Sequence, residues 1–331
     1  MRCLPAIRHL RLGLSQRPES RSKAERRRPA PIVVAEVEHY AGCVIGVANA
    51  GRHEVGPPVT TDAFSEFERI GWERAAASYE ECWTDTELFV ESLLDAARVH
   101  EGSRLLDVAC GPGFVSEAAA ARGAEPVGLD VAAAMVERAR RRCPGLRFVE
   151  GDAQRLPFPD ACFDAGTMNF GILHVSGPET ALREARRVLR PGGRFAFTVW
   201  VAEGHAADEI VDAAIRAYAV PVELPEGPPV YRFADLDESR RVLGEMAFDL
   251  DSFRADTVTA IWRIPTAELL FDAHMRAGVR VAGVLHAQPP ELLEAIREAI
   301  VEGVRRYADD DEFALPIVSR VISARVGAQP A

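Results

Sequence analysis

The chain has 331 residues, of which 48% are hydrophobic and 27% charged, a mixture that can bury a sizeable core and excludes global disorder. Its formal net charge is −11, although residues 1–30 hold nine basic groups against two acidic ones, so the rest is strongly acidic. An acidic body repels nucleic acid and anionic membranes. No run of 18 apolar residues occurs, so we also expect no integral membrane association.

Residues 1–60 differ in composition from the rest of the chain. They are rich in Arg, Pro and Ser near the start and lack the apolar region of a secretory signal. We interpret them as a basic extension, either a disordered tail or a mis-called start, and a transit peptide is left open. The working protein then begins near Val59 or Thr60, and residues 61–331 form the functional domain.

Helices and then alternating elements follow. We expect two N-terminal covering helices within 62–100, at 62–81 and 87–99. Predicted strands are 103–109, 126–129, 146–150, 163–169 and 193–200, and predicted helices between them are 115–122, 132–142 and 179–189. Apolar strands that alternate with helices indicate an α/β fold with a doubly wound, mostly parallel sheet.

The alternation loosens after Trp200. We expect helices at 206–218 and 237–246, a strand at 251–264, helices at 267–277 and 290–307, and a last strand at 313–326. The last two strands would pair with each other. The helices between them, within 265–311, would then form a lid rich in large apolar residues.

A glycine turn and three acidic residues indicate a ligand. Gly111 and Gly113 lie between the first strand and the next helix, where glycines allow close backbone approach. Asp107 ends that strand and would repel a pyrophosphate but suit a cation. Asp130 ends the next strand, where an acid can accept both ribose hydroxyls. Asp152 follows the third strand and can accept from an adenine amino group. Together they describe a nucleoside with a cationic tail, which S-adenosylmethionine fits.

Here the sequence resembles the class I S-adenosylmethionine-dependent methyltransferases, in the small-molecule branch with the quinone and sterol C-methylases. The resemblance rests on Leu105–Gly113, Gly128–Asp130, Gly151–Phe158 and Glu184–Gly193. It implies a seven-stranded sheet of order 3-2-1-4-5-7-6 with the last strand antiparallel. It also implies S-adenosyl-L-methionine as the cofactor.

The resemblance also implies roles for single residues. Gly111 and Gly113 would back the methionine moiety, with Asp107 near its ammonium, and Asp130 would hold the ribose. The other expected contacts are Val131 and Met135 beside the adenine, Asp152 and Ala153 at its edge, Asn169 toward the methionine and the substrate, and Tyr79 covering the cofactor. The family often has Gly where this chain has Ala109, which crowds the loop slightly.

Each candidate also has a structural interpretation. Asp107, Asp130 and Asp152 could cap a strand end, cap a helix and make a turn, respectively. Asn169 could satisfy loop amides. The six cysteines form no CxxC pair and have no metal spacing to a histidine, so we expect reduced thiols, a cytoplasmic location and no metal.

The predicted reaction is methyl transfer to O, N or C of an apolar small metabolite. A general base is needed only if the acceptor must lose a proton. The candidates are His174 and His205, each just after a strand end. A non-catalytic binding protein stays open as an alternative, since its motifs would be identical. A nicotinamide dehydrogenase would want Gly at Ser116 and an apolar residue at Asp107. Self-association into a homodimer is left open.

Overall fold

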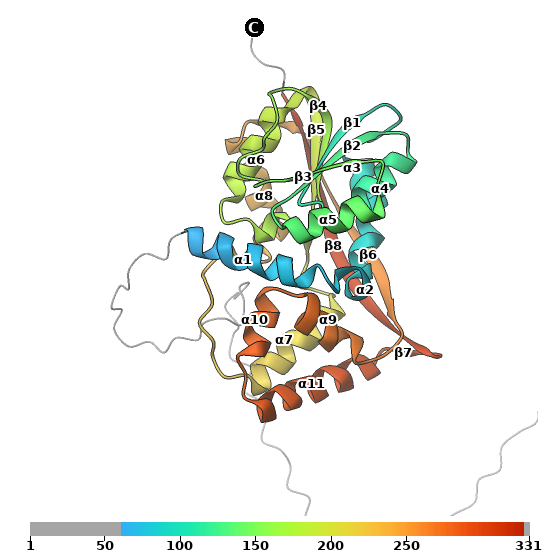
Figure 1. Ribbon diagram of the computed structural model, residues 1–331, viewed down its shortest axis with the longest axis vertical. Coiled ribbons are helices and arrows are strands. Elements are labelled where there is room, and N and C mark those ends of the chain that lie inside the picture. The colour runs from blue at the N-terminus through green and yellow to red at the C-terminus, as the bar shows by residue number, and fades with distance from the viewer. Residues whose placement is uncertain (1–60, 328–331) are drawn as a thin grey trace, which may run out of the picture. The chain divides into compact units, whose positions relative to one another are not determined.

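The computed structural model describes residues 61–327, and these build one mixed sheet (Figure 1). Its strands are β1 (Arg104–Val108), β2 (Glu125–Asp130), β3 (Arg147–Glu150), β4 (Phe163–Met168), β5 (Leu189–Trp200), β6 (Phe248–Ile264), β7 (Ala308–Asp309) and β8 (Glu312–Val326). The order is β3-β2-β1-β4-β5-β8-β6, and β8 runs antiparallel to both β5 and β6. This confirms the expected order of the seven main strands. The two-residue β7, which pairs with β8, was not expected.

Alternation along each strand divides the core between the two faces of the sheet. In β1, Leu105 packs against one helix layer and its neighbour Leu106 against the other. The first layer holds α3 (Val90–Ala96), α4 (Phe114–Ala121) and α5 (Ala133–Arg142), and the second holds α6 (Pro178–Val188) and α8 (Leu236–Glu245). Both faces of the parallel strands are therefore buried, as the continuous apolar strands predicted.

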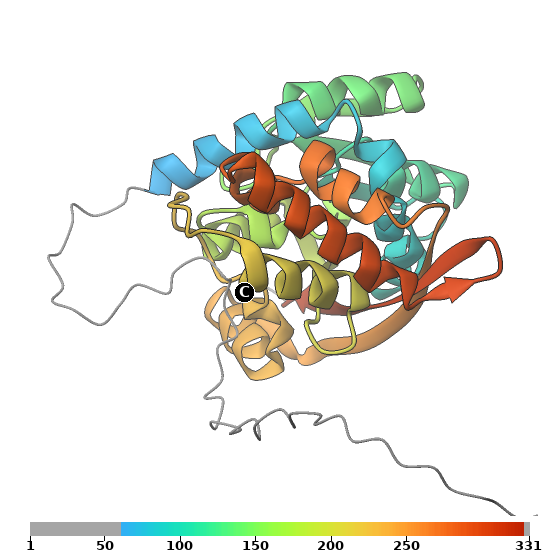
Figure 2. The ribbon, with the colours of Figure 1, turned by 90° about the horizontal axis from the view of Figure 1, so that it is seen from below.

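The helices between β6 and β8 form the lid, together with one helix from outside that segment. They are α9 (Leu269–Ala277), α10 (Arg280–His286) and α11 (Pro290–Arg305). α7 (Ala206–Tyr218) packs along α11, as Figure 2 shows. Sequence analysis missed α10, because seven residues give too little periodicity to distinguish a helix from a loop. The apolar core of the lid packs against the end of β6 and the beginning of β8, where it contacts Trp262 and Ile317.

The N-terminal helices differ from the prediction. A single helix over 62–81 is wrong, because the chain turns after α1 (Thr61–Ala75) and restarts as α2 (Tyr79–Cys82). The 3-10 turns η1 (Thr84–Phe89), η2 (Ile172–His174) and η3 (Arg232–Ala234) are also present. Glu73 of α1 accepts hydrogen bonds from the backbone N–H groups of Ala133 and Ala134 at 2.7 and 3.0 Å. These two bonds hold α1 across the N-terminus of α5.

Several sequence predictions concern other features of the chain. The extension over residues 1–60, with Cys3 and Cys43, lies outside the described residues. Within 61–327 the four cysteines carry free thiols. None of the helices in that part combines the length and the apolarity that a bilayer crossing requires. The same residues contain no group of three or more His, Cys, Asp or Glu side chains arranged for a metal ion.

Candidate functional site

A cavity of about 330 Å³ lies where the central strands end, under α1 and the lid. Ala109 follows β1, Asp130 ends β2, Asp152 follows β3, Asn169 follows β4 and Trp200 ends β5, and all five line it. Because β1 to β5 are parallel, their carboxyl ends meet at this edge. The cavity lining includes ten of the twelve predicted site residues: Tyr79, Gly111, Asp130, Val131, Met135, Asp152, Ala153, Asn169, His174 and His205. Asp107 and Gly113 do not line it.

Asp130 links the glycine turn to the start of the next helix. One carboxylate oxygen accepts from the N–H of Gly111 and the other from the N–H of Ala132, both at 2.9 Å. Asp130 therefore bonds to the backbone just before α5, while Glu73 accepts from the first N–H groups of that helix, and Asp130 also lines the cavity. A carboxylate oxygen has two lone pairs, so each oxygen of Asp130 can still accept one further hydrogen bond. The carboxylate therefore suits a pair of neighbouring hydroxyl groups.

The glycine turn uses its two glycines differently. Gly111 has a φ of +51°, and a Cβ there would meet nothing within 4 Å, so its backbone is open to the cavity. Gly113 has a φ of +94°, and a Cβ there would press on Ala139 and Phe148 at 3.3 Å. Gly113 is therefore a packing residue at the start of α4, which explains why it does not line the cavity. Ala109 also has a left-handed φ, +53°, which explains why glycine is favoured at that position.

Asp107 lies behind the turn and is completely buried. Its carboxylate accepts from the hydroxyls of Ser116 at 2.7 Å and Thr167 at 3.3 Å. Burial raises the pKa of Asp107 to about 7, although these two hydrogen bonds lower it. The carboxylate therefore braces β1, α4 and β4 from within. In this structure it does not reach the cavity side, where the sequence had placed it beside an ammonium group.

The buried Asp107 predicts a pH-dependent stability. Its pKa of about 7 in the folded state exceeds the value of about 3.9 in an unfolded chain, so the folded state holds an extra proton between these values. This contribution to the unfolding free energy is present below pH 4 and is lost as the pH rises to 7. An Asp107→Asn variant has no carboxyl group to titrate at this position, so its unfolding free energy does not fall with pH for this reason. In urea unfolding, the unfolding free energy of the variant should therefore rise relative to that of the wild type by about 1.4 kcal/mol per pH unit between about pH 4 and 7. A difference that does not change with pH would contradict the assignment.

Apolar residues and one rim carboxylate surround the end of the cavity next to β2 and β3. Met135 is buried, Val131 is exposed, and Ala153 is buried beside them. Asp152 is exposed, and one of its oxygens accepts from the N–H of Gln154 at 2.8 Å, which makes the predicted turn. These residues form an apolar slot with an acceptor at its edge, as a purine base requires.

Asn169 and Tyr79 both contact Thr86 in η1. The Asn169 amide donates to the Thr86 carbonyl at 3.1 Å and accepts from the Thr198 hydroxyl at 2.7 Å. The Tyr79 hydroxyl also bonds to the Thr86 side chain. The amide of Asn169 thus ties strand ends to η1, which is the loop-satisfying role that sequence analysis kept as its alternative. Both residues still line the cavity.

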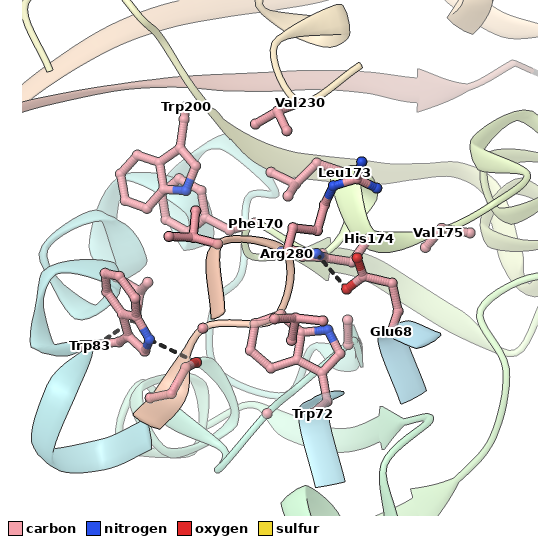
Figure 3. A pocket seen from close by; sticks show the side chains of 18 of the residues that line it. Glu68, Trp72, Trp83, Phe170, Leu173, His174, Val175, Trp200, Val230 and Arg280 are labelled. Atoms are coloured by element: carbon pink, nitrogen blue, oxygen red, sulfur yellow. Dashed lines mark hydrogen bonds and ion pairs between the residues drawn. The ribbon is translucent and has the colours of Figure 1, made fainter. Parts of the chain in front are cut away.

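His174 forms a pair with a buried carboxylate of α1. Its Nδ1 lies 3.0 Å from Oε2 of Glu68, and its ring meets Trp72 edge-on at 4.8 Å between centroids (Figure 3). A carboxylate can only accept, so the Nδ1–H of His174 donates to Glu68, which leaves Nε2 as the nitrogen that faces away from this pair. The geometry allows His174 to act as a base, but it also packs the ring in place.

His205 has the opposite tautomer. It is the N-cap of α7, and its Nδ1 accepts from the N–H of Asp208 at 3.3 Å. The ring proton therefore sits on Nε2, which is buried and has no partner among the described residues. A neutral His205 can donate a hydrogen bond from Nε2 but cannot accept a proton there.

Several charged residues of the cavity lining could not be predicted from the sequence, among them Glu68, Asp85 and Arg280. Glu68 and Asp85 are each 2% exposed, and burial raises the pKa of Asp85 to about 7. Arg280, at the start of α10, is the sole Arg or Lys in the lining among the described residues (Figure 3). Its guanidinium lies over the ring of Phe64, and its Nε and Nη1 have no hydrogen-bond partner in the described part. Arg280 could not be predicted because its helix was not expected.

Comparison with known proteins gives a consistent result. Residues 106–197 match the family described as "Methyltransferase domain". A demethylmenaquinone methyltransferase of Beutenbergia cavernae is 46% identical over 107 residues, which cover 32% of this chain and 45% of that protein. A malonyl-[acyl-carrier protein] O-methyltransferase of Erwinia pyrifoliae is 33% identical over 180 residues, covering 54% and 65%.

The solved structures include a putative methyltransferase from an antibiotic biosynthesis pathway of Anabaena variabilis. It is 20% identical, has a TM-score of 0.49, and the match covers 72% of this chain and 96% of that one. The matched segment spans less than two thirds of the length of the two curated relatives above. The family match over residues 106–197 includes the turns after β1 to β4, which build the cavity edge.

Proposed function

We propose that the chain is a class I S-adenosylmethionine-dependent methyltransferase, as its family match and its curated relatives support, and that it transfers a methyl group from S-adenosyl-L-methionine to an O, N or C atom of an apolar small molecule. The observation that carries this proposal is the cavity edge. Gly111 and Asp130 meet there, where the Gly111 N–H donates to Asp130, and neither Arg nor Lys is among the described residues that line this edge.

The residues of the cavity edge fit this methyl donor. The free lone pairs of Asp130 would accept the two ribose hydroxyls, and the slot of Val131, Met135 and Ala153 would hold the adenine with Asp152 at its edge. The open backbone of Gly111 would lie along the methionine moiety. When bound, the donor supplies an activated methyl group by in-line displacement at its sulfonium, and the protein contributes alignment and exclusion of water.

A dehydrogenase is disfavoured by a particular contact. A dinucleotide-binding turn would have a third glycine where Ser116 stands and an apolar residue where Asp107 stands. Instead these two side chains bond to each other at 2.7 Å in the core. A binding protein without catalysis is disfavoured by the lid, because the cavity continues past the cofactor slot to Trp83, Trp200 and His274.

The acceptor is proposed from the walls of this second region. They are aromatic and apolar, with Phe170 stacked on Trp200 at 3.7 Å between ring centroids. The names of two curated relatives give demethylmenaquinone and malonyl-[acyl-carrier protein] as the groups that they methylate. We propose an apolar small molecule as partner and a cytoplasmic location. A homodimer stays open.

Turnover tests the proposal directly. Incubating the full chain with S-adenosylmethionine and a panel of apolar metabolites should yield S-adenosylhomocysteine and a methylated product together. The panel should carry hydroxyl, amine and activated-carbon acceptors, so that the product identifies the acceptor atom. Binding of the methyl donor with no turnover across the panel would favour the non-catalytic alternative. Failure to bind the donor would contradict the proposal.

A further inference from the structure

Three buried polar side chains converge on the aromatic end of the cavity. Asp85, His205 and His274 are 2%, 2% and 8% exposed, and all three line the cavity. Asp85 Oδ1, His205 Nε2 and His274 Nε2 have no hydrogen-bond partner among residues 61–327. A buried polar atom without a partner loses about 1–3 kcal/mol of hydrogen-bond free energy. Three such atoms around one cavity indicate that a ligand completes their bonding.

The segment that carries Asp85 is held firmly. The indole N–H of Trp262 donates to the Thr84 hydroxyl at 3.0 Å, and the Asn169 amide donates to the Thr86 carbonyl at 3.1 Å. Both neighbours of Asp85 are therefore fixed to other elements. The carboxylate of Asp85 is therefore held in position before a ligand binds, which is what catalysis requires of a group that contacts a reacting atom.

Aromatic rings line this region. Trp200 stacks on Phe170 and lies nearly perpendicular to the ring of His205, at 4.8 Å between ring centroids. Trp83 stands against His274 at 5.0 Å. Aromatic side chains on two sides suit a planar ligand. A hydroxyl group both donates and accepts, so it could bond to Asp85 Oδ1 and to the Nε2–H of His205 together.

Resting on the methyl-transfer function, we propose that Asp85 takes the proton of a neutral, planar, hydroxylated acceptor, a phenol or an enol, while the Nε2–H of His205 holds the acceptor oxygen. The acceptor's O–H bond breaks, its electron pair stays on the oxygen, and the proton moves to Oδ1 of Asp85. The oxygen, or the carbon conjugated with it, is then the nucleophile. Asp85 returns the proton to water when the product leaves.

Charges around Asp85 support this role. The ionisable groups that share its surroundings are Tyr79 of α2, His205 and Asp208 of α7, and His274 of α9. Burial and the nearby Asp208 raise the pKa of Asp85 to about 7, close to where a general base works best. Burial lowers the pKa of His274 to about 4, so His274 adds a neutral hydrogen-bonding group and no charge.

Binding of two matched probes tests the proposal without methyl transfer. 4-Nitrophenol carries the hydroxyl, and 4-nitroanisole replaces its proton with a methyl group. Quenching of the fluorescence of the cavity tryptophans reports the affinity for each probe. The wild type should prefer the phenol by about tenfold or more, since a hydrogen bond to a charged group is lost with the ether. Equal affinities, or no binding of either probe, would overturn the proposal.

Variants then assign the preference to residues. Asp85→Asn keeps the shape of the side chain and should reduce the preference to near unity. Asp272→Asn, on α9 but outside the cavity lining, is the matched control and should keep it. His205→Asn keeps a capping oxygen for α7 but removes the Nε2–H donor, and should weaken phenol binding. Unchanged preference in Asp85→Asn, checked for folding by thermal unfolding, would contradict the assignment.

The rate profile separates Asp85 from the competing base. With S-adenosylmethionine and a hydroxylated acceptor, the wild-type rate should rise with pH through about 7, because the ionised carboxylate accepts the proton. Asp85→Asn should lose this rise, with a rate lower by about 10²-fold or more. Loss of the rise in His174→Ala instead would assign the proton to His174. Absence of turnover with intact probe discrimination would count against methyl transfer and leave the acceptor site standing.

Discussion

A Trp262→Ala variant should lose about 3–5 kcal/mol of unfolding free energy, the largest effect we expect from a single substitution. Trp262 lies on β6 and is 1% exposed, so its removal leaves a large cavity in the lid core. Its indole N–H also donates to Thr84 at 3.0 Å, and its ring stacks on Trp83. The substitution therefore removes both the hydrogen bond and the ring contact that hold β6, beside the lid, to the segment around η1.

The neighbouring residue provides the control. Ile261 precedes Trp262 on the same strand but is 46% exposed, so Ile261→Ala should stay within about 0.5 kcal/mol of the wild type. Trp262→Phe should fall between the two, because it keeps most of the ring and loses the hydrogen bond. Urea unfolding of the three variants measures the differences. A Trp262→Ala variant as stable as Ile261→Ala would contradict this view of the lid.

An Asp130→Ala variant should bind S-adenosylmethionine more weakly by about 1–3 kcal/mol, or roughly 5- to 150-fold. The ribose hydroxyls would lose their acceptor, and the N–H groups of Gly111 and Ala132 would lose theirs. Asp130→Asn keeps one oxygen and should fall between wild type and Asp130→Ala. Isothermal calorimetry on variants that remain folded gives the affinities.

The surface residue Asp160 supplies the control for this series. Asp160 is exposed and pairs with Arg187 outside the cavity. Asp160→Ala should therefore bind the methyl donor as the wild type does. Unchanged affinity in a folded Asp130→Ala variant would remove Asp130 from the cofactor site.

The sheet could be predicted because its signal is local. Adjacent apolar residues such as Leu105 and Leu106 face opposite layers, which only a strand covered on both sides allows. The break between α1 and α2 could not be predicted, because the residues from Ala75 to Ser78 include neither Gly nor Pro and give no local signal that a helix ends. The turn there lets Tyr79 and Trp83 reach the cavity, which is a tertiary requirement.

The functional site could likewise be predicted only where the signal is local in sequence. Asp130 and Asp152, at or just after strand ends, line the cavity, because parallel strands end at one edge. Asp107 is the last residue but one of β1, and its side chain points into the core toward Ser116 and Thr167. Asp85 was missed because its importance comes from burial beside α7 and α9, elements more than a hundred residues away in sequence.

The most direct test of the account is a binding measurement on the wild-type chain. Calorimetry should show that S-adenosylmethionine and S-adenosylhomocysteine bind at one site per chain and displace each other, while NAD does not compete. That result follows from a cavity edge lined by Asp130 and Asp152, with Asp107 and Ser116 at the positions where a dinucleotide-binding turn would have an apolar residue and a glycine. Binding of NAD without binding of the methyl donor would contradict the central claim.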